Sequence, residues 1–173
     1  MVIEILNSKD FNKVYALMEI SFPEDERRTY SEQKELLSNS EYKIYVSREP
    51  QTHEIQVFAA VWEFAEFAFI EHLAVNPKYR NKGIGAEFLN AIVKSLDKMV
   101  CLEVEPPINE MATRRIGFYE RNNFFFNEYE YMQPAISKGR KAIQLFIMSS
   151  VCKITKTEFE NIKNIIYKRV YRV

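Results

Sequence analysis

Residues 69–86 read FIEHLAVNPKYRNKGIGA. The apolar run that ends at Val75 has the composition of a buried strand, and Asn76-Pro77 is a turn signal. A basic loop with two glycines follows and leads into a helix. Gly83 and Gly85 leave the backbone bare where a ligand must come close, and the first N–H groups of a helix are unpaired. The stretch therefore predicts a strand, a turn and a helix start that suits a pyrophosphate.

The residues on either side predict elements in the order β α α β β β α β α β β α. Strands are expected at residues 2–6, 42–48, 54–64, 67–75, 99–105, 124–132 and 141–148. Helices are expected from residue 11 to before Pro23, from about 29 to 38, and over 84–96, 111–122 and 157–171. Because three strands run together before the long helix, a regular βαβ array is excluded. We expect an α/β (α+β) fold with a mixed sheet and helices on its faces.

Three further features are predicted, namely helix caps, an apolar stripe on the last helix and a basic hairpin turn. Thr29 and Thr157 each precede a glutamate by three residues, so both are expected to begin a helix with a capping box. The last helix carries an apolar stripe that packs on the core or against a second subunit, so a homodimer stays an open alternative. Lys138, Arg140 and Lys141 are expected to lie in a solvated hairpin turn.

Composition excludes several classes of protein. The chain has 173 residues, 47% hydrophobic and 28% charged, which is typical of one globular domain over residues 1–173. Lys plus Arg and Asp plus Glu both total 24, so the strong positive field of a general nucleic-acid binder is missing. There is no signal-peptide core and no membrane-spanning run, so we expect a cytoplasmic protein. Two scattered cysteines and two histidines predict no disulfide framework and no metal site.

The loop at residues 80–86 does not fit the two commonest phosphate-binding motifs. A dinucleotide fingerprint needs a third glycine, and that position is Phe88. A nucleoside-triphosphate loop needs Gly-Lys-Ser/Thr, which does not follow. The charges of Arg80 and Lys82 still favour an anionic ligand beside the helix start.

Two motifs resemble one known family. Arg80-x-x-Gly83-x-Gly85, preceded by Leu73-Ala74-Val75, looks like the acetyl-coenzyme A signature of the GCN5-related N-acetyltransferase (GNAT) superfamily. Residues 115–124, RIGFYERNNF, are similar to its FYE(K/R)xGF segment, with Asn123 where the family usually has glycine. Asn tolerates a left-handed backbone, so the turn is expected to survive. The resemblance covers about residues 2–149 and leaves the helix at about 157–171 outside the common core.

The resemblance implies a central, mostly antiparallel twisted sheet with helices on both faces. It also implies acetyl-CoA as cosubstrate, with no metal. The strands at 67–75 and 99–105 are expected to splay, with the thioester in the gap. The residues expected to bind acetyl-CoA are the strand end that pairs with pantetheine and the loop that holds the pyrophosphate: Leu73, Ala74, Val75, Arg80, Asn81, Lys82, Gly83, Ile84, Gly85 and Ala86.

The implied reaction is direct attack of a neutral amine on the thioester. Tyr119 matches the family position that gives its hydroxyl proton to the leaving sulfur. Glu71 is the favoured base, and strict alternation places it on the face of Phe69 and Leu73, with His72 on the other face. The alternatives for the base are His72, Glu103, Glu105 or a water chain.

The amine substrate is the least determined part. It is expected to be a primary amine of a small molecule, a peptide or a protein. The residues expected to form the walls of its pocket are Phe22, Pro23, Glu26, Arg27, Trp62, Phe64, Tyr129 and Tyr131. Two other functions stay open, namely a non-catalytic coenzyme-A-binding module and an acyltransferase that uses a longer acyl-CoA.

Overall fold

The computed structural model describes all residues from 1 to 173. Its strands form one seven-stranded sheet in the order β1-β2-β3-β4-β5-β7-β6. The β4–β5 pair is parallel and every other pair is antiparallel, which confirms the mixed, mostly antiparallel sheet. The strands are β1 (Glu4–Ile5), β2 (Tyr42–Arg48), β3 (Ile55–Glu63), β4 (Ala68–Val75), β5 (Val100–Val104), β6 (Phe124–Gln133) and β7 (Ile143–Ser150).

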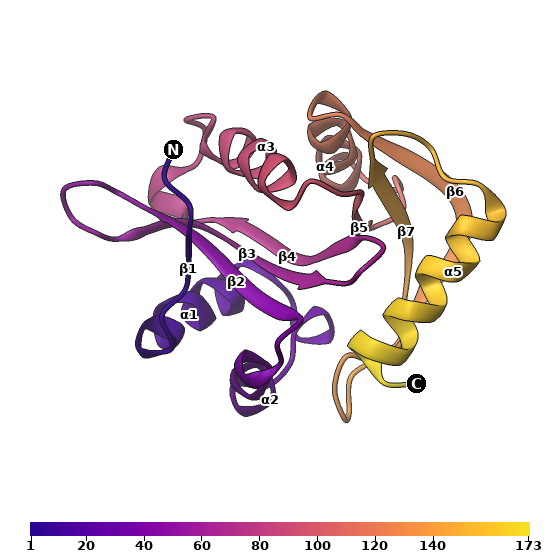
Figure 1. The fold of residues 1–173 in the computed structure, drawn as a ribbon, viewed down its shortest axis with the longest axis horizontal. Helices are drawn as coiled ribbons and strands as arrows, with labels where there is room; N and C mark the ends of the chain where they lie inside the picture. Colours follow the sequence, from indigo (N-terminus) through magenta and orange to yellow (C-terminus); the bar gives the residue numbers. More distant parts are fainter.

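The helices follow in the expected order and cover both faces of the sheet (Figure 1). Helices α3 and α4 lie on one face, and α1, α2 and α5 lie on the other. The last helix continues into a π-helical turn at Tyr167–Tyr171. The helices are α1 (Phe11–Ser21), α2 (Tyr30–Glu35), α3 (Ile84–Leu96), α4 (Glu110–Arg121) and α5 (Lys156–Ile166).

Each face of the sheet has its own hydrophobic core, because successive strand residues point to opposite faces. The larger core lies under α1, α2 and α5, and the smaller one lies under α3 and α4. The stripe of α5 is buried in the larger core through Phe159, Ile162 and Ile166. Of the two placements left open for this stripe, the chain's own core is the one observed.

The predicted capping box is confirmed at α2, whereas at α5 the box forms at a neighbouring threonine. Thr29 and Glu32 form the expected capping box at the start of α2. Helix α5 begins at Lys156, and its cap lies two residues before the predicted one, with the box formed by Thr155 and Glu158. The sequence offers two threonines, each with a glutamate three residues later, so spacing alone does not choose between them.

Two irregularities of β4 shape the centre of the molecule. Its pairing with β5 extends only from Ala68 to Ile70, and beyond that point the two strands separate. The predicted splay is therefore confirmed. On the other edge of β4, Val61 of β3 pairs with Ile70 and Ala60 pairs with His72, so Glu71 is an extra residue in a β-bulge.

Candidate active site

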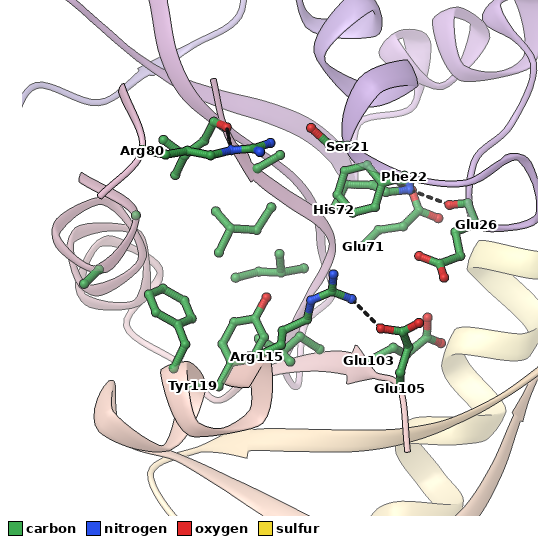
Figure 2. A pocket seen from close by; sticks show the side chains of 18 of the residues that line it. Ser21, Phe22, Glu26, Glu71, His72, Arg80, Glu103, Glu105, Arg115 and Tyr119 are labelled. Atoms are coloured by element: carbon green, nitrogen blue, oxygen red, sulfur yellow. Dashed lines mark hydrogen bonds and ion pairs between the residues drawn. The ribbon is translucent and has the colours of Figure 1, made fainter. Parts of the chain in front are cut away.

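A cavity of about 580 Å³ opens where β4 and β5 separate. Strand β4, the loop before α3, helix α4 and the segment after α1 contribute to its lining (Figure 2). The cavity brings together every residue that the sequence selected for acetyl-CoA binding and catalysis except Lys82. That lysine is exposed, and its ammonium lies 5.5 Å from the centre of the Tyr79 ring.

One end of the cavity has the geometry of an anion site. Gly83 is the N-cap of α3 and adopts a left-handed conformation, with φ of 76°. The backbone N–H groups of residues 81–86 have no hydrogen-bond partner within the chain. The Arg80 guanidinium beside them is anchored by a hydrogen bond from Nε to the Val75 carbonyl, at 3.2 Å. A row of free N–H groups at a helix start is suited to phosphate oxygens.

The two loop glycines serve different purposes. A Cβ on Gly83 would meet no atom within 4 Å, so its requirement is the positive φ angle. A Cβ on Gly85 would lie 3.1 Å from Cγ2 of Val75 and 3.7 Å from the Phe118 ring. Gly85 therefore lets α3 pack closely against β4 and α4, which sets the position of the N–H groups.

Tyr119 projects from α4 toward the middle of the cavity (Figure 2). Its ring packs against Phe118 and Phe124, and its hydroxyl makes no hydrogen bond within the chain. Burial raises the pKa of Tyr119 to about 12, so the phenol carries its proton at neutral pH. The turn after α4 holds Asn123 at φ of 62°, which confirms that Asn keeps the left-handed turn.

Glu71 lies on the opposite wall and is tied to a buried arginine. Nη1 of Arg28 donates to Oε1 of Glu71 at 2.6 Å, and Nη2 donates to the Val170 carbonyl at 3.1 Å. The side chains of Arg28 and Glu71 are 6% and 2% exposed. The second carboxylate oxygen, Oε2, is buried and has no hydrogen-bond partner.

The predicted separation of Glu71 and His72 onto opposite faces is wrong. The bulge at Glu71 interrupts the alternation, so both side chains turn toward the segment after α1. Nδ1 of His72 lies 3.7 Å from Oε2 of Glu71. Nε2 of His72 lies 2.7 Å from the Glu26 carbonyl. Burial lowers the pKa of His72, although the charge of Glu71 acts in the opposite direction.

Glu103 is a half-buried residue of β5 whose carboxyl has no cationic partner. The hydroxyls of Tyr131 and Tyr171 donate to it, the latter at 2.8 Å to Oε2. Burial raises the pKa of Glu103 to about 7, against the effect of the two hydroxyls. Because Tyr171 belongs to the terminal π-helical turn, the end of the chain helps to build this part of the site.

The mouth of the cavity is also acidic. Arg115 of α4 pairs with Glu105, with 2.8 Å between Nη1 and Oε2. Glu26 lines the same region without a cationic partner, and burial, followed by the charge of Glu105, raises the pKa of its carboxyl. This end therefore presents more carboxyl groups than arginines, in contrast to the basic loop at the other end.

The predicted walls of the amine pocket are only partly right. Phe22 and Glu26 line the cavity, and Pro23 lines the groove beside it. The assignment of Trp62 and Phe64 to the pocket wall is wrong, because both are buried in the larger core. Arg27, Tyr129 and Tyr131 do not reach the cavity surface. Sequence reasoning missed Ser21, Gln133 and Leu145, which line the cavity but carry no local signal.

The hairpin loop between β6 and β7 is docked through Arg140, whereas Lys138 and Lys141 are exposed, so the expected solvated turn is only partly right. Arg140 pairs with Glu24 at 2.7 Å, and its side chain is 19% exposed. The Lys141 backbone N–H donates to Asp25 at 3.2 Å. These contacts tie the loop to the segment between α1 and α2, because acidic and basic runs far apart in sequence meet there.

Two general features bear on function. No group of three or more His, Cys, Asp or Glu side chains is arranged to hold a metal ion. None of the helices combines the length and the apolar character that a membrane crossing requires.

A helix start with free N–H groups, an open strand edge and a protonated phenol meet in one cavity, an arrangement suited to a large anionic donor of a transferred group. The comparisons with known proteins agree. The model of the acetyltransferase (GNAT) family matches residues 11–124. The chain therefore belongs to the GNAT family of acetyltransferases. A search of curated proteins found no match.

Solved structures share the fold. A protein of Bacteroides thetaiotaomicron assigned to the GNAT family is 28% identical, with a TM-score of 0.91 over 100% of this chain and 99% of its own. The ribosomal-protein-S18-alanine N-acetyltransferase of Escherichia coli is 19% identical, with a TM-score of 0.66 over 89% and 95%. A variant of the spermidine N-acetyltransferase of Vibrio cholerae is 16% identical, with a TM-score of 0.65 over 87% and 94%. At these last two identities the likeness concerns the fold alone.

Proposed function

We propose that this chain transfers the acetyl group of acetyl-CoA to a primary amine, and that it does so in the cytoplasm. One observation carries the proposal: a single cavity joins free N–H groups at a helix start to a protonated phenol and an acidic pocket. Each part answers one need of the reaction, namely donor binding, thiol release and capture of a cationic substrate.

The loop before α3 is the proposed site for the pyrophosphate of acetyl-CoA. Free N–H groups and the positive end of the helix dipole favour phosphate oxygens there, and Arg80 adds a charge. Beyond Ile70, the β5-facing edge of β4 has no strand partner. That edge, at Leu73, Ala74 and Val75, is suited to pair with the amides of the pantetheine arm.

The proposed reaction moves two protons. The amine nitrogen forms a bond to the thioester carbon, and the bond from that carbon to sulfur breaks with its electron pair going to sulfur. Tyr119 gives its hydroxyl proton to the sulfur, which suits a phenol that is protonated at neutral pH. The amine gives its proton to a base on the wall that contains Glu71 and His72.

Two carboxyl groups compete with Glu71 for the role of base. Glu105 is paired with Arg115 and sits at the mouth, so it suits the guidance of a cation toward the cavity. Glu103 lines the cavity and has a pKa of about 7, which also matches the requirements of a base. Replacing each glutamate in turn by glutamine and measuring the rate of transfer shows which of the three carboxyl groups acts as the base.

The acidic pocket favours a substrate with an ammonium group. Glu26 and Glu103 have no cationic partner, so a positive charge would offset the cost of burying them. Two fold neighbours are named for amine substrates, spermidine in one case and a ribosomal-protein alanine in the other. The substrates to be tried therefore include both small amines and peptide amines.

The first experiment is calorimetric titration with acetyl-CoA, coenzyme A and NADH. Saturable binding of the first two without binding of NADH is expected. A panel of amines, followed by release of free thiol, then measures transfer, with butyryl-CoA as the donor of greater length. Failure of both coenzyme A forms to bind would overturn the proposal. Binding without transfer to any amine would favour a binding module, and faster transfer from butyryl-CoA would favour a longer-chain acyltransferase.

A further inference from the structure

Two hydrogen-bonding side-chain atoms on the bulge of β4, beside the cavity, have no partner. Oε2 of Glu71 and Nδ1 of His72 are both buried, and neither forms a hydrogen bond. Both side chains are 2% exposed and both residues line the cavity. Buried polar atoms in native proteins are normally paired, because an unpaired one costs about 1–3 kcal/mol.

The Glu26 carbonyl fixes the tautomer of His72. A carbonyl oxygen only accepts hydrogen bonds, so Nε2, at 2.7 Å from it, must carry a hydrogen. Burial lowers the pKa of His72, which favours the neutral ring. In a neutral ring with hydrogen on Nε2, Nδ1 carries a lone pair and accepts.

Two hydrogen-bond acceptors therefore stand 3.7 Å apart, and neither can donate to the other. A donor with two hydrogens placed between them satisfies both. An amine nitrogen that enters the cavity is such a donor.

One short segment of the chain orients both acceptors. The Glu26 carbonyl holds the imidazole, and Nη1 of Arg28 holds Oε1 of Glu71 at 2.6 Å. The Phe22 ring packs edge-on against the His72 ring, with 4.7 Å between centres. Figure 2 shows Phe22, Glu26, Glu71 and His72 together on the wall opposite Tyr119.

We propose that Glu71 Oε2 and His72 Nδ1 together hold the N–H groups of the reacting amine, and that His72 Nδ1 takes the proton that the amine loses. This inference rests on the proposed function and deepens it. The N–H bond breaks as the nitrogen bonds to the thioester carbon, and the proton becomes the Nδ1–H of an imidazolium. The Glu71 carboxylate compensates the new charge, and solvent later removes the proton.

The charges around His72 come from two elements. Glu71 on β4 favours the imidazolium, whereas Arg28, from the segment after α1, opposes it, as does burial. Glu103 on β5 lines the same cavity and accepts hydrogen bonds from the hydroxyls of Tyr131 and Tyr171. Activity is expected to fall on acidification as the lone pair of His72 becomes protonated, with a midpoint below the ordinary value of 6.5 for histidine.

The test combines NMR with pH profiles. The chain has two histidines, so ¹⁵N-histidine spectra of the protein and of a His53→Gln variant assign His72. The neutral ring is expected to carry hydrogen on Nε2. An Nδ1–H tautomer or a charged ring at neutral pH would overturn the acceptor pair, whatever the activity.

For the proton transfer, His72→Gln keeps a donor toward the Glu26 carbonyl but has no titrating lone pair. It is expected to lower kcat about 10²- to 10⁴-fold and to remove the acid limb of kcat/KM, with binding of acetyl-CoA retained. Glu103→Gln is the matched comparison and is expected to keep that limb. If His72→Gln keeps the limb and Glu103→Gln loses it, the proton goes to Glu103 and the inference is wrong. Absence of transfer by the unaltered protein would overturn the proposed function and this step with it, while the NMR result would still decide the tautomer.

Discussion

Replacement of Glu103 by glutamine is expected to stabilise the protein at alkaline pH and to have little effect at acidic pH. Glu103 is a half-buried residue of β5 whose carboxyl lacks a cationic partner, and only the hydroxyls of Tyr131 and Tyr171 bind it. A glutamine has nearly the same shape as the protonated carboxyl, and its oxygen accepts from the same hydroxyls.

The magnitude follows from the pKa of Glu103, which burial raises from the ordinary 4.5 to about 7. The folded state binds the proton more tightly than the unfolded state. The stability from this group is therefore fully present below pH 4.5 and is lost as the pH rises through about 7. At about 1.36 kcal/mol per unit of pKa, the loss is about 3 kcal/mol. Glutamine has no proton to lose, so Glu103→Gln should gain about 3 kcal/mol near pH 8 and under about 1 kcal/mol near pH 5.

Urea unfolding at the two pH values measures the difference, with fluorescence of Trp62 as the signal. Trp62 is the chain's single tryptophan and is buried in the larger core, so its emission reports global unfolding. Glu66→Gln, at an exposed position in the turn before β4, is the matched control. A gain for Glu103→Gln that is the same at both pH values, or a loss at the higher pH, would refute the reasoning.

Three further substitutions test the site. Arg28→Met leaves the buried Glu71 carboxylate without its cation and is expected to cost about 3–5 kcal/mol of unfolding free energy, most of which Glu71→Leu should restore. A loss under about 1 kcal/mol in urea unfolding would mean that the pair behaves as an exposed one. Tyr119→Phe is expected to lower kcat about 10²-fold or more with the Kd of acetyl-CoA unchanged, and unchanged kcat would remove Tyr119 from the mechanism. Gly83→Val places a β-branched residue at a φ of 76°, which strains the loop by about 1–3 kcal/mol and should abolish binding of acetyl-CoA in calorimetry; normal binding would contradict the loop assignment.

The order of elements and the conformation of the glycine-containing loop before α3 could be predicted because their signals are local. The strand, turn, glycine loop and helix of residues 69–86 are consecutive, and both the N-cap glycine and the left-handed Asn123 follow from single residues. The apolar stripes of α3 and α5 likewise fix which side of each helix is buried. The observed starts of several elements differ from the predicted ones by one or two residues. At α5 this is because Thr155 and Thr157 both have the spacing of a capping threonine.

The geometry around Glu71 could not be predicted in this way. A bulge shifts the alternation of a strand by one residue, and nothing in the sequence around Glu71 marks it. The shift puts Glu71 and His72 on one wall, which changes the choice of base. Trp62 and Phe64 were misplaced for a related reason, since aromatic residues have the same pattern in a core as in a pocket wall.

The two ends of the cavity differ in how far their residues are separated along the chain, and this bears on specificity. The proposed donor end is built from consecutive residues 73–86, whereas the proposed amine end depends on contacts between distant segments. Arg28 donates to the Val170 carbonyl, and Tyr171 donates to Glu103. The last turn of the chain therefore holds two charged groups of the amine end, although it lies beyond the family match at 11–124. Under the proposed function, the loop that binds the donor therefore says little about the amine that is selected, because the residues at the two ends of the cavity belong to different segments of the chain.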